Sequence, residues 1–532
     1  MGQYLASLEV DQRQRLILQA DKLQEMLGAS RLIEQTVEAA RRLLATRKDI
    51  KLVTPVSGVL RFQATDLQEL GEFLWGLRLE IVEKLHLPST FTITLQEAGG
   101  LFKSSIDRLE ERVRGNKDAK TGERSGPASP LFAQCQIQPH LSANVWAPGD
   151  WRDTDKRRRS LVSHESEQRE TEAAGTFSEQ FKNFAALRKF REKQATSVWN
   201  ALPVEFADLA TGSEDSYIAF VKADGDGMGR LLMQLDWDKL RPGNAADGCR
   251  EFSEAVERCL NDSTKTAVDE VTNGWEYSKH NGFPVAPLVR AGEDYWIVCR
   301  RDLAFPLAIA LGNAYAELAS KGIIEEARSC VEELKDERLT LSFGILFAKQ
   351  GFPFEAQLHM AEALVKSAKR FRSQHQLEPE KKTGCLDYYW LESSAREDVI
   401  EYRDSTLRIR DGAAEFQLYT TPWTLPETRS FWGAAEKLKA AKFPARKLKQ
   451  LETILRLGAD FSGLAFEQWR RMLRQGEWES LVGALKVLPA RFPMAAATAA
   501  DQPFLPMAVD KDHHWTPLLD LLKVVEIQEM HT

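Results

Sequence analysis

The chain has 532 residues, 43% of them hydrophobic and 28% charged, a composition typical of a folded protein and a length too great for a single core. The net charge of −7 excludes a global attraction to nucleic acid, so any RNA contact has to use local basic patches. No apolar run is long enough to cross a bilayer and no secretory signal is visible, which predicts a cytoplasmic protein without a membrane partner.

Strand and helix patterns alternate through the first segment of the chain. They fall in the order strand, helix, hairpin, helix, strand, over residues 5–10, 13–44, 51–62, 67–85 and 90–95. The strands alternate apolar and polar residues, and the helices carry apolar residues at helical spacing. The order βαββαβ predicts a ferredoxin-like domain over residues 1–100.

The next region, residues 101–205, carries weaker patterns. Residues 115–130 are rich in Gly, Ser, Lys and Pro, which predicts a loop or linker. Residues 156–159 form the basic run Lys-Arg-Arg-Arg. A charged run is more often a solvated face than a binding site.

A second set of patterns repeats the order of the first with a longer insert. Its strands and helices fall at residues 217–221, 228–272, 285–299, 303–334, 339–347 and 354–372. The repeat predicts a second ferredoxin-like domain over residues 206–385, followed by a lysine-rich helical bundle over residues 386–532. We therefore expect an α+β chain with two ferredoxin-like domains that pack as a pseudo-symmetric pair.

Acidic residues follow two strands of the second domain. Residues 224–226 read Asp-Gly-Asp at the end of its first strand, and residues 292–294 read Gly-Glu-Asp in its hairpin turn. In a ferredoxin-like sheet these two places lie side by side, so the carboxylates would converge and need a cation. Mg²⁺ or Mn²⁺ suits oxygen ligands and would also bind the phosphates of ATP. Each turn alone is common in ordinary loops, so the prediction depends on both together.

Two further features support a triphosphate site. Gly225 and the glycines after it remove side chains where phosphate has to approach the backbone. Lys369, near the end of the last helix of the domain, could reach a triphosphate as a point charge. The combination predicts a metal–nucleotide site.

Several motifs, taken in order, resemble one protein family. They are YIAFVKADGDGMGRLL at 217–232, AGED at 291–294, LSFGIL at 341–346 with AK at 368–369, LDYY at 386–389 with TPW at 421–423, and residues 4–30. The set resembles the large polymerase/cyclase-like subunit of type III CRISPR effector complexes. The resemblance covers most of the chain. It implies two palm domains, a small zinc-binding domain between them and a helical C-terminal domain.

The resemblance also implies an activity and roles for single residues. The activity is conversion of ATP to cyclic oligoadenylate when a complex of several subunits, with its crRNA, binds target RNA. Asp224, Glu293 and Asp294 would hold the metal as catalytic residues. The residues expected against the nucleotide are Gly225, Asp226, Gly292, Ser342 at the nucleotide pocket and Lys369 at the triphosphate.

The sequence departs from the family pattern at four places. Ala291 and Glu293 alter the usual Gly-Gly-Asp-Asp turn, and residues 56–59 of the first palm, Val-Ser-Gly-Val, lack its acids, so we expect that palm to be non-catalytic. No His is followed by Asp and no segment long enough precedes the first palm, which predicts no HD nuclease domain. Gln138 stands where Cys135 would need a second cysteine, and no later C-x-x-C exists. His140 and His164 are weak substitutes, so we expect the zinc site to be lost.

Two other functions remain open from the sequence. The altered turn and degenerate zinc segment fit a catalytically silent scaffold that grips RNA-bound partners through lysines between 437 and 449 and through the basic run at 156–159. The expected lack of a nuclease domain fits a stand-alone cyclase that makes a different cyclic nucleotide.

Overall fold

The computed structural model describes residues 3–11, 13–18, 22–85, 91–119, 145–148, 159–162, 203, 205–210, 216–275, 282–291, 294–335, 337–374, 383–392, 398–411, 414–457, 459–488, 507–508 and 513–528. The zinc candidates Cys135, His140 and His164, together with Gln138, lie outside these residues, as do 156–158 of the basic run. The chain divides into two compact units, one of residues 1–209, 227–297 and 314–339, the other of residues 210–226, 298–313 and 340–532. The predicted domain boundaries remain a prediction.

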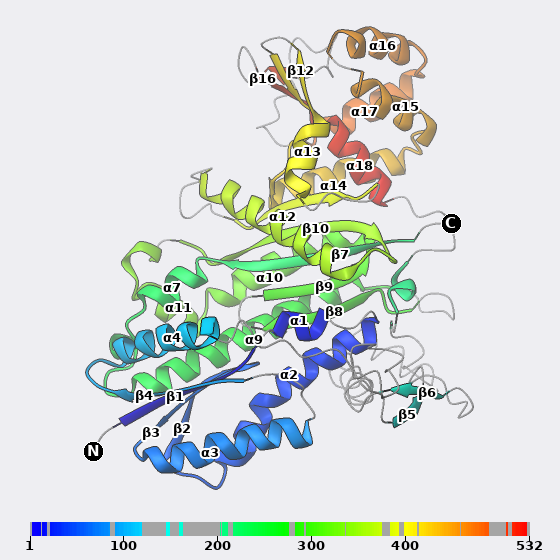
Figure 1. Ribbon diagram of the computed structural model, residues 1–532. Helices are drawn as coiled ribbons and strands as arrows, with labels where there is room; N and C mark the ends of the chain where they lie inside the picture. Colours follow the sequence, from blue (N-terminus) through cyan, green and yellow to red (C-terminus); the bar gives the residue numbers. More distant parts are fainter. Residues whose placement is uncertain are drawn as a thin grey trace. The chain divides into compact units, whose positions relative to one another are not determined.

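The first ferredoxin-like domain has the predicted order. Its elements are β1 (Gln3–Val10), α1 (Arg13–Leu18), α2 (Leu23–Leu44), β2 (Ile50–Val56), β3 (Val59–Ala64), α3 (Leu67–Leu79) with a π-helical turn (Glu80–Lys84), and β4 (Phe91–Ala98). The sheet order is β2-β3-β1-β4 and every neighbouring pair is antiparallel, which confirms the ferredoxin-like prediction (Figure 1).

The two faces of this sheet are covered by different helices. On one face, Phe62 of β3 meets Phe73 of α3 with ring centroids 4.9 Å apart. On the other face, Leu5 of β1 packs with Ile106 and Leu109 of α4 (Phe102–Ala119). The helix that follows the fourth strand therefore lies on the face opposite α3, because successive strand residues point to opposite sides.

The second ferredoxin-like domain also has the predicted order. Its elements are β7 (Tyr217–Asp226), α7 (Met228–Gln234), α8 (Trp237–Leu240), α9 (Ala245–Val271), β8 (Val285–Ala291), β9 (Asp294–Arg300), α10 (Ala304–Ala319), α11 (Gly322–Ser329), β10 (Thr340–Lys349) and α12 (Phe354–Gln374). They contribute to a sheet of order β14-β11-β10-β7-β9-β8, which contains the ferredoxin-like order and extends it.

The extension corrects the expectation that the chain turns helical from residue 386. Residues Cys385–Trp390 form β11, parallel to β10, and β14 (Trp423–Thr424) pairs with β11. Five of the six residues of β11 are buried, so the run lacks the alternation by which a half-exposed strand is recognised. A separate sheet of order β12-β13-β16-β15 also lay outside the prediction.

The remaining C-terminal elements confirm a helical region. The strands of the separate sheet are β12 (Arg408–Asp411), β13 (Ala414–Gln417), β15 (Met507–Ala508) and β16 (His513–Trp515). The helices are α13 (Val399–Leu407), α14 (Leu425–Ala440), α15 (Ala445–Leu455), α16 (Ala459–Arg471), α17 (Gln475–Leu485) and α18 (Leu518–Gln528). Ten of the eleven residues of α18 are buried, so this helix is part of the core.

A buried polar network joins α18 to β11. Asp520 of α18 accepts hydrogen bonds from the Tyr388 hydroxyl at 3.1 Å and from the backbone nitrogen and hydroxyl of Thr420 at 2.6 and 2.7 Å. Burial raises the pKa of Asp520 to about 6, although these donors and Arg403 oppose the shift. Beside it, Arg403 and Asp387 form a fully buried ion pair.

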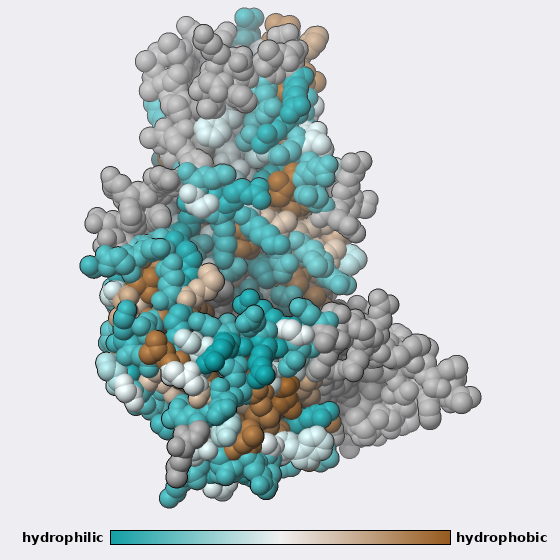
Figure 2. All heavy atoms as spheres, turned by 60° about the vertical axis from the view of Figure 1, so that its left-hand side comes forward, coloured by the Kyte–Doolittle hydropathy of each residue, from teal (hydrophilic) through white to brown (hydrophobic). Residues whose placement is uncertain are grey.

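The surface in view is mainly hydrophilic, with separate apolar patches (Figure 2). Among the described residues, the most exposed large apolar side chain is Phe461 of α16, at 72% exposure. Leu464 is exposed three residues further along the same helix, and Met472 is exposed just after its end. No single helix within the described ranges has the length and apolarity to cross a membrane. The pair Arg301–Ala319 and Gly322–Ser329, bent by 71°, passes that test only when its two helices are taken together.

Candidate active site

Alternate residues of β7 place a row of charged side chains under α12. Lys222, Asp224 and Asp226 lie two residues apart and therefore point to the same face of the sheet. Phe220 lies on that face too, and it meets Phe354 of α12 with ring centroids 5.0 Å apart. Helix α12 therefore covers the acidic end of β7 (Figure 1).

Each of the three charged residues pairs with one residue of α12. Lys222 meets Glu362 at 3.1 Å, Asp224 meets Lys369 at 2.8 Å, and Asp226 meets Arg372 at 3.5 Å; these are the residue pairs of an ion-pair ladder between strand and helix. We call this set the β7–α12 ladder. Its central pair contains the predicted metal ligand Asp224 and the predicted triphosphate residue Lys369.

A glycine allows α12 to approach the sheet this closely. A Cβ atom on Gly344 of β10 would lie 2.3 Å from the carbonyl oxygen of Ala361 and 2.7 Å from the backbone nitrogen of Val365. Because both are backbone atoms of α12, they could not move aside without shifting the helix. Gly344 lies opposite Lys222 in the strand register, so the contact sets the height of α12 over the ladder.

Asp224 has one carboxylate oxygen that is buried and has no hydrogen-bond partner among the described residues, and we call it the open oxygen. The open oxygen is Oδ1. Oδ2 of Asp224 accepts from Lys369, whose Nζ also donates to the carbonyl oxygen of Gly225 at 3.0 Å. An unpartnered carboxylate oxygen beside a backbone carbonyl is a ligand set that suits a hard divalent cation, so Asp224 fits the expected metal.

Asp226, which is predicted to lie beside the nucleotide, is the centre of a buried cluster. Its carboxylate accepts from the hydroxyls of Thr340 and Ser342, both at 2.8 Å, and it faces Arg372. Burial raises the pKa of Asp226 above its ordinary value, against the opposing effect of Arg372 and the two hydroxyls. In this arrangement Asp226 holds β7, β10 and α12 together.

Ser342 belongs to the same buried cluster, and its predicted role at the nucleotide remains a prediction. Its side chain is completely buried and its hydroxyl donates to Asp226. The strand register explains this contact, because Ser342 lies directly opposite Asp224 and two pairs away from Asp226, on the same face of the sheet. The sequence located Ser342 near the acids without showing that α12 covers it.

The hairpin half of the predicted site is described only in part. Ala291 ends β8 and Asp294 begins β9, whereas Gly292 and Glu293 fall outside the described residues. Within those residues no three His, Cys, Asp or Glu side chains are grouped as they would be around a metal. The predicted roles of Gly292, Glu293 and Asp294 therefore remain predictions.

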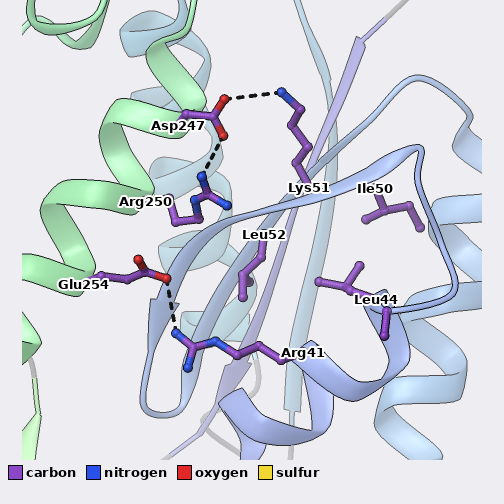
Figure 3. A pocket seen from close by; sticks show the side chains of 9 residues that line it. Arg41, Leu44, Ile50, Lys51, Leu52, Asp247, Arg250 and Glu254 are labelled. Carbon is purple, nitrogen blue, oxygen red and sulfur yellow. Dashed lines mark hydrogen bonds and ion pairs between the residues drawn. The ribbon is translucent and has the colours of Figure 1, made fainter.

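A surface pocket of about 370 Å³ is lined by none of these residues (Figure 3). Its walls come from α2, β2 and α9, with an apolar base that includes Leu44 and Leu52. Its charged residues pair with one another, Arg41 with Glu254 at 3.2 Å and Asp247 with Lys51 at 3.5 Å and Arg250 at 3.2 Å. Each of these charged side chains already has a partner of opposite sign, and no predicted site residue lines the pocket, so nothing connects the pocket with the nucleotide.

Comparison with known proteins places the ladder in a recognised domain. The family model described as "Cas10/Cmr2, second palm domain" matches residues 217–377, which include β7, β10 and α12. The comparison with curated proteins gives no match.

Solved structures with a similar fold come from Csm1–Csm4 cassettes. Crystal structures of such a cassette with cA4 and with cA3 match with TM-scores of 0.52 and 0.51, each at 14% identity over 99% of this chain and 70% of the other. The cassette with pppApA matches with a TM-score of 0.51 at 14% identity, over 99% of this chain and 69% of the other. At this identity the likeness shows the fold.

Proposed function

We propose, from the premise that the chain carries a palm domain of the Cas10/Cmr2 family, that it is a metal-dependent nucleotidyltransferase that makes cyclic oligoadenylate from ATP. The observation that carries the proposal is Asp224, which lies near the end of β7. One of its carboxylate oxygens is buried without a hydrogen-bond partner, and a lysine lies 2.8 Å from the other. The cA4, cA3 and pppApA bound in the similar structures belong to those proteins, and they support adenylate chemistry here.

The proposed roles follow from the charges of the site. Asp224 would hold Mg²⁺ or Mn²⁺, and Glu293 and Asp294 would share that task by the sequence resemblance. The bound ion would lower the pKa of an attacking 3′-hydroxyl and stabilise the leaving pyrophosphate. Lys369 would bind the triphosphate, and Asp226 would fix the end of β7 so that Asp224 keeps its position.

A multi-subunit complex is the proposed setting of this activity. The similar structures pair Csm1 with Csm4, which supports other subunits of a type III-like complex as partners, with crRNA and target RNA bound mostly through them. The exposed apolar residues of α16 are the kind of surface that a partner subunit covers. These partners belong to the proposal.

The test is product formation by the purified protein, alone and with co-purifying partners and target RNA. The reaction contains ATP and Mn²⁺, and mass spectrometry identifies the product. We expect a cyclic adenylate from the wild type and a loss of about 100-fold or more in Asp224→Asn, since the amide cannot replace a charged metal ligand. The control Asp262→Asn removes one exposed carboxylate from α9 and should leave the yield unchanged.

Other outcomes point to the other two functions. Equal product from wild type and Asp224→Asn would reject the proposal. If no product forms even with partners and RNA, while the complex still assembles, the chain is a catalytically silent scaffold. The altered turn at Ala291 is the sequence feature that suggests this alternative. A cyclic nucleotide of another mass from the isolated chain would indicate a stand-alone cyclase.

A further inference from the structure

The central pair of the β7–α12 ladder places a cation where a metal ion would bind. The Nζ of Lys369 lies 2.8 Å from Oδ2 of Asp224 and 3.0 Å from the carbonyl oxygen of Gly225. A carboxylate oxygen and a backbone carbonyl are the ligand types that a hard divalent cation uses. In this structure the ammonium group therefore satisfies part of the site that we propose for metal.

We propose that Lys369 is a built-in competitor for the metal, which holds Asp224 in the nucleotide-free protein and is drawn away by a triphosphate. The inference rests on the proposed function and adds a dependence between its two ligands. The metal binds weakly when it is alone and tightly when the nucleotide is present. The triphosphate carries several negative charges, so it offers Lys369 a stronger partner than one carboxylate does.

The exposure of two ladder pairs shows why the pair of Lys369 and Asp224 can separate while the other stays closed. The side chains of Lys369 and Asp224 are 33% and 27% exposed, so water can solvate both when they separate. Arg372 and Asp226 are 8% and 4% exposed, and separating them would leave two charges in a dry interior. Lysine also has a flexible stem and a compact charge that can turn between acceptors. The Asp226 pair thus fixes the frame in which Lys369 moves.

The first palm contains a similar pair that cannot bind metal in the same way. Lys117 of α4 meets Glu9 of β1 at 2.6 Å, and Lys117 and Lys369 are each the sixteenth residue of the helix after the fourth strand. Both oxygens of Glu9 have partners, because Ser7 donates to Oε1 and Lys117 to Oε2. The open oxygen of Asp224 therefore distinguishes the second palm, and the first palm supplies a matched control.

The consequence is positive cooperativity between metal and nucleotide. If a triphosphate removes Lys369 from Asp224, metal affinity rises, and by thermodynamic linkage metal raises nucleotide affinity by the same factor. We expect a factor of about five or more, the lower end of measured couplings, because both partners are partly solvated.

The test measures Mn²⁺ binding by the loss of the free-ion signal in electron paramagnetic resonance, with and without a non-hydrolysable ATP analogue. The Mn²⁺ that the analogue binds by itself is measured in a titration without protein and subtracted. The proteins are wild type, Lys369→Met, Lys369→Gln, and the controls Lys366→Met and Lys117→Met. Lys366 is exposed on the same helix, so its loss removes the same charge without touching Asp224. Far-ultraviolet circular dichroism confirms that each variant is folded.

We expect wild type and both controls to bind Mn²⁺ about fivefold or more tightly with the analogue than without it. Both Lys369 variants should bind Mn²⁺ more tightly than wild type without the analogue, and should gain little when it is added. Because the phosphates of the analogue are themselves metal ligands, the gain in wild type has to exceed the gain in the Lys369 variants. Two different substitutions of Lys369 keep the test available if one variant fails to fold.

Two results would overturn the inference, and they differ in what else they overturn. Wild type that binds Mn²⁺ equally with and without the analogue, or Lys369 variants with unchanged affinity, would remove the competitor and leave the proposed function standing. Wild type that binds no Mn²⁺ even with the analogue would overturn the proposed function and this inference together.

Discussion

In the first palm, both carboxylate oxygens of Glu9 on the first strand accept hydrogen bonds, one from a serine and one from a lysine. In the second palm, Asp224 on the first strand has a partner, a lysine, on only one of its two carboxylate oxygens. Both sheets have the ferredoxin-like strand order, and in both the helix after the fourth strand carries the lysine. The two palms therefore share a frame and differ in a few side chains on one strand face.

The difference shows which features of the second palm are additional to the frame. Asp226 adds a buried cluster beneath the open aspartate, and Gly344 brings α12 close to the sheet, whereas β4 of the first palm contains no glycine. Closer packing and a fixed strand end are what a site needs to hold a ligand in one geometry. We infer that the frame provides the fold and these additions provide the site.

The largest expected effect comes from removing the close approach. Gly344→Ala should destabilise the protein by about 3 kcal/mol or more, because the new methyl group would overlap backbone atoms of α12. Gly351→Ala is the control, since a Cβ atom there meets nothing within 4 Å. Urea unfolding followed by tryptophan fluorescence measures both; equal midpoints for the two variants would show that α12 can shift freely.

The Asp226 cluster should come next. Asp226→Ala leaves Arg372 and the hydroxyls of Thr340 and Ser342 without their common acceptor, which should cost about 3 kcal/mol in unfolding free energy. Asp226→Asn keeps one acceptor oxygen and should recover part of that loss. A stable Asp226→Ala variant with full product yield would show that the cluster is unnecessary for positioning Asp224.

The sequence predicted most of this frame and less of the site. Apolar residues spaced at a period of 2 in strands and 3.6 in helices located these elements in both palms, because one face of each element is buried and the other is exposed. It missed β11, which is buried almost throughout. It also did not show that Asp226 and Ser342 are buried together, since strand position shows which residues are near one another but not which face a later helix covers.

Lys369 illustrates the same limit from the other side. Its place near the end of α12 was predicted from the sequence. Its pairing with Asp224 depends on the distance between α12 and the sheet, which is set by the close contact of Gly344 with the backbone of α12. The corresponding Lys117 was missed, although the equal spacing from the start of each helix was a signal that an internal comparison of the two palms could have used.

The stability of the second palm should depend on pH by about 2 kcal/mol. The reason is that its sheet is extended by β11, whose Tyr388 donates a hydrogen bond to the buried carboxylate of Asp520. The pKa of Asp520 is raised to about 6 in the folded protein, so the folded state binds this proton more tightly than the unfolded state. Its contribution to stability is therefore full below about pH 4 and is lost as the pH rises through about 6.

The measurement is the unfolding free energy of wild type minus that of Asp520→Asn between about pH 4 and pH 7. The amide does not titrate, so this difference should fall by about 2 kcal/mol across the range. Tyr388, Thr420 and Arg403 face Asp520 and are the same in both proteins. A difference independent of pH would mean that Asp520 keeps an ordinary pKa.

The smallest expected effect is in the first palm. Lys117→Met breaks the pair with Glu9 at a place where the lysine is 38% exposed and Ser7 still donates, so the loss of stability should be about 1 kcal/mol or less. Unfolding in urea measures it, with Lys366→Met as the exposed control. If Lys117→Met also altered cyclic adenylate yield or Mn²⁺ affinity, the first palm would take part in the chemistry. The division between a shared frame and a site confined to the second palm would then be wrong.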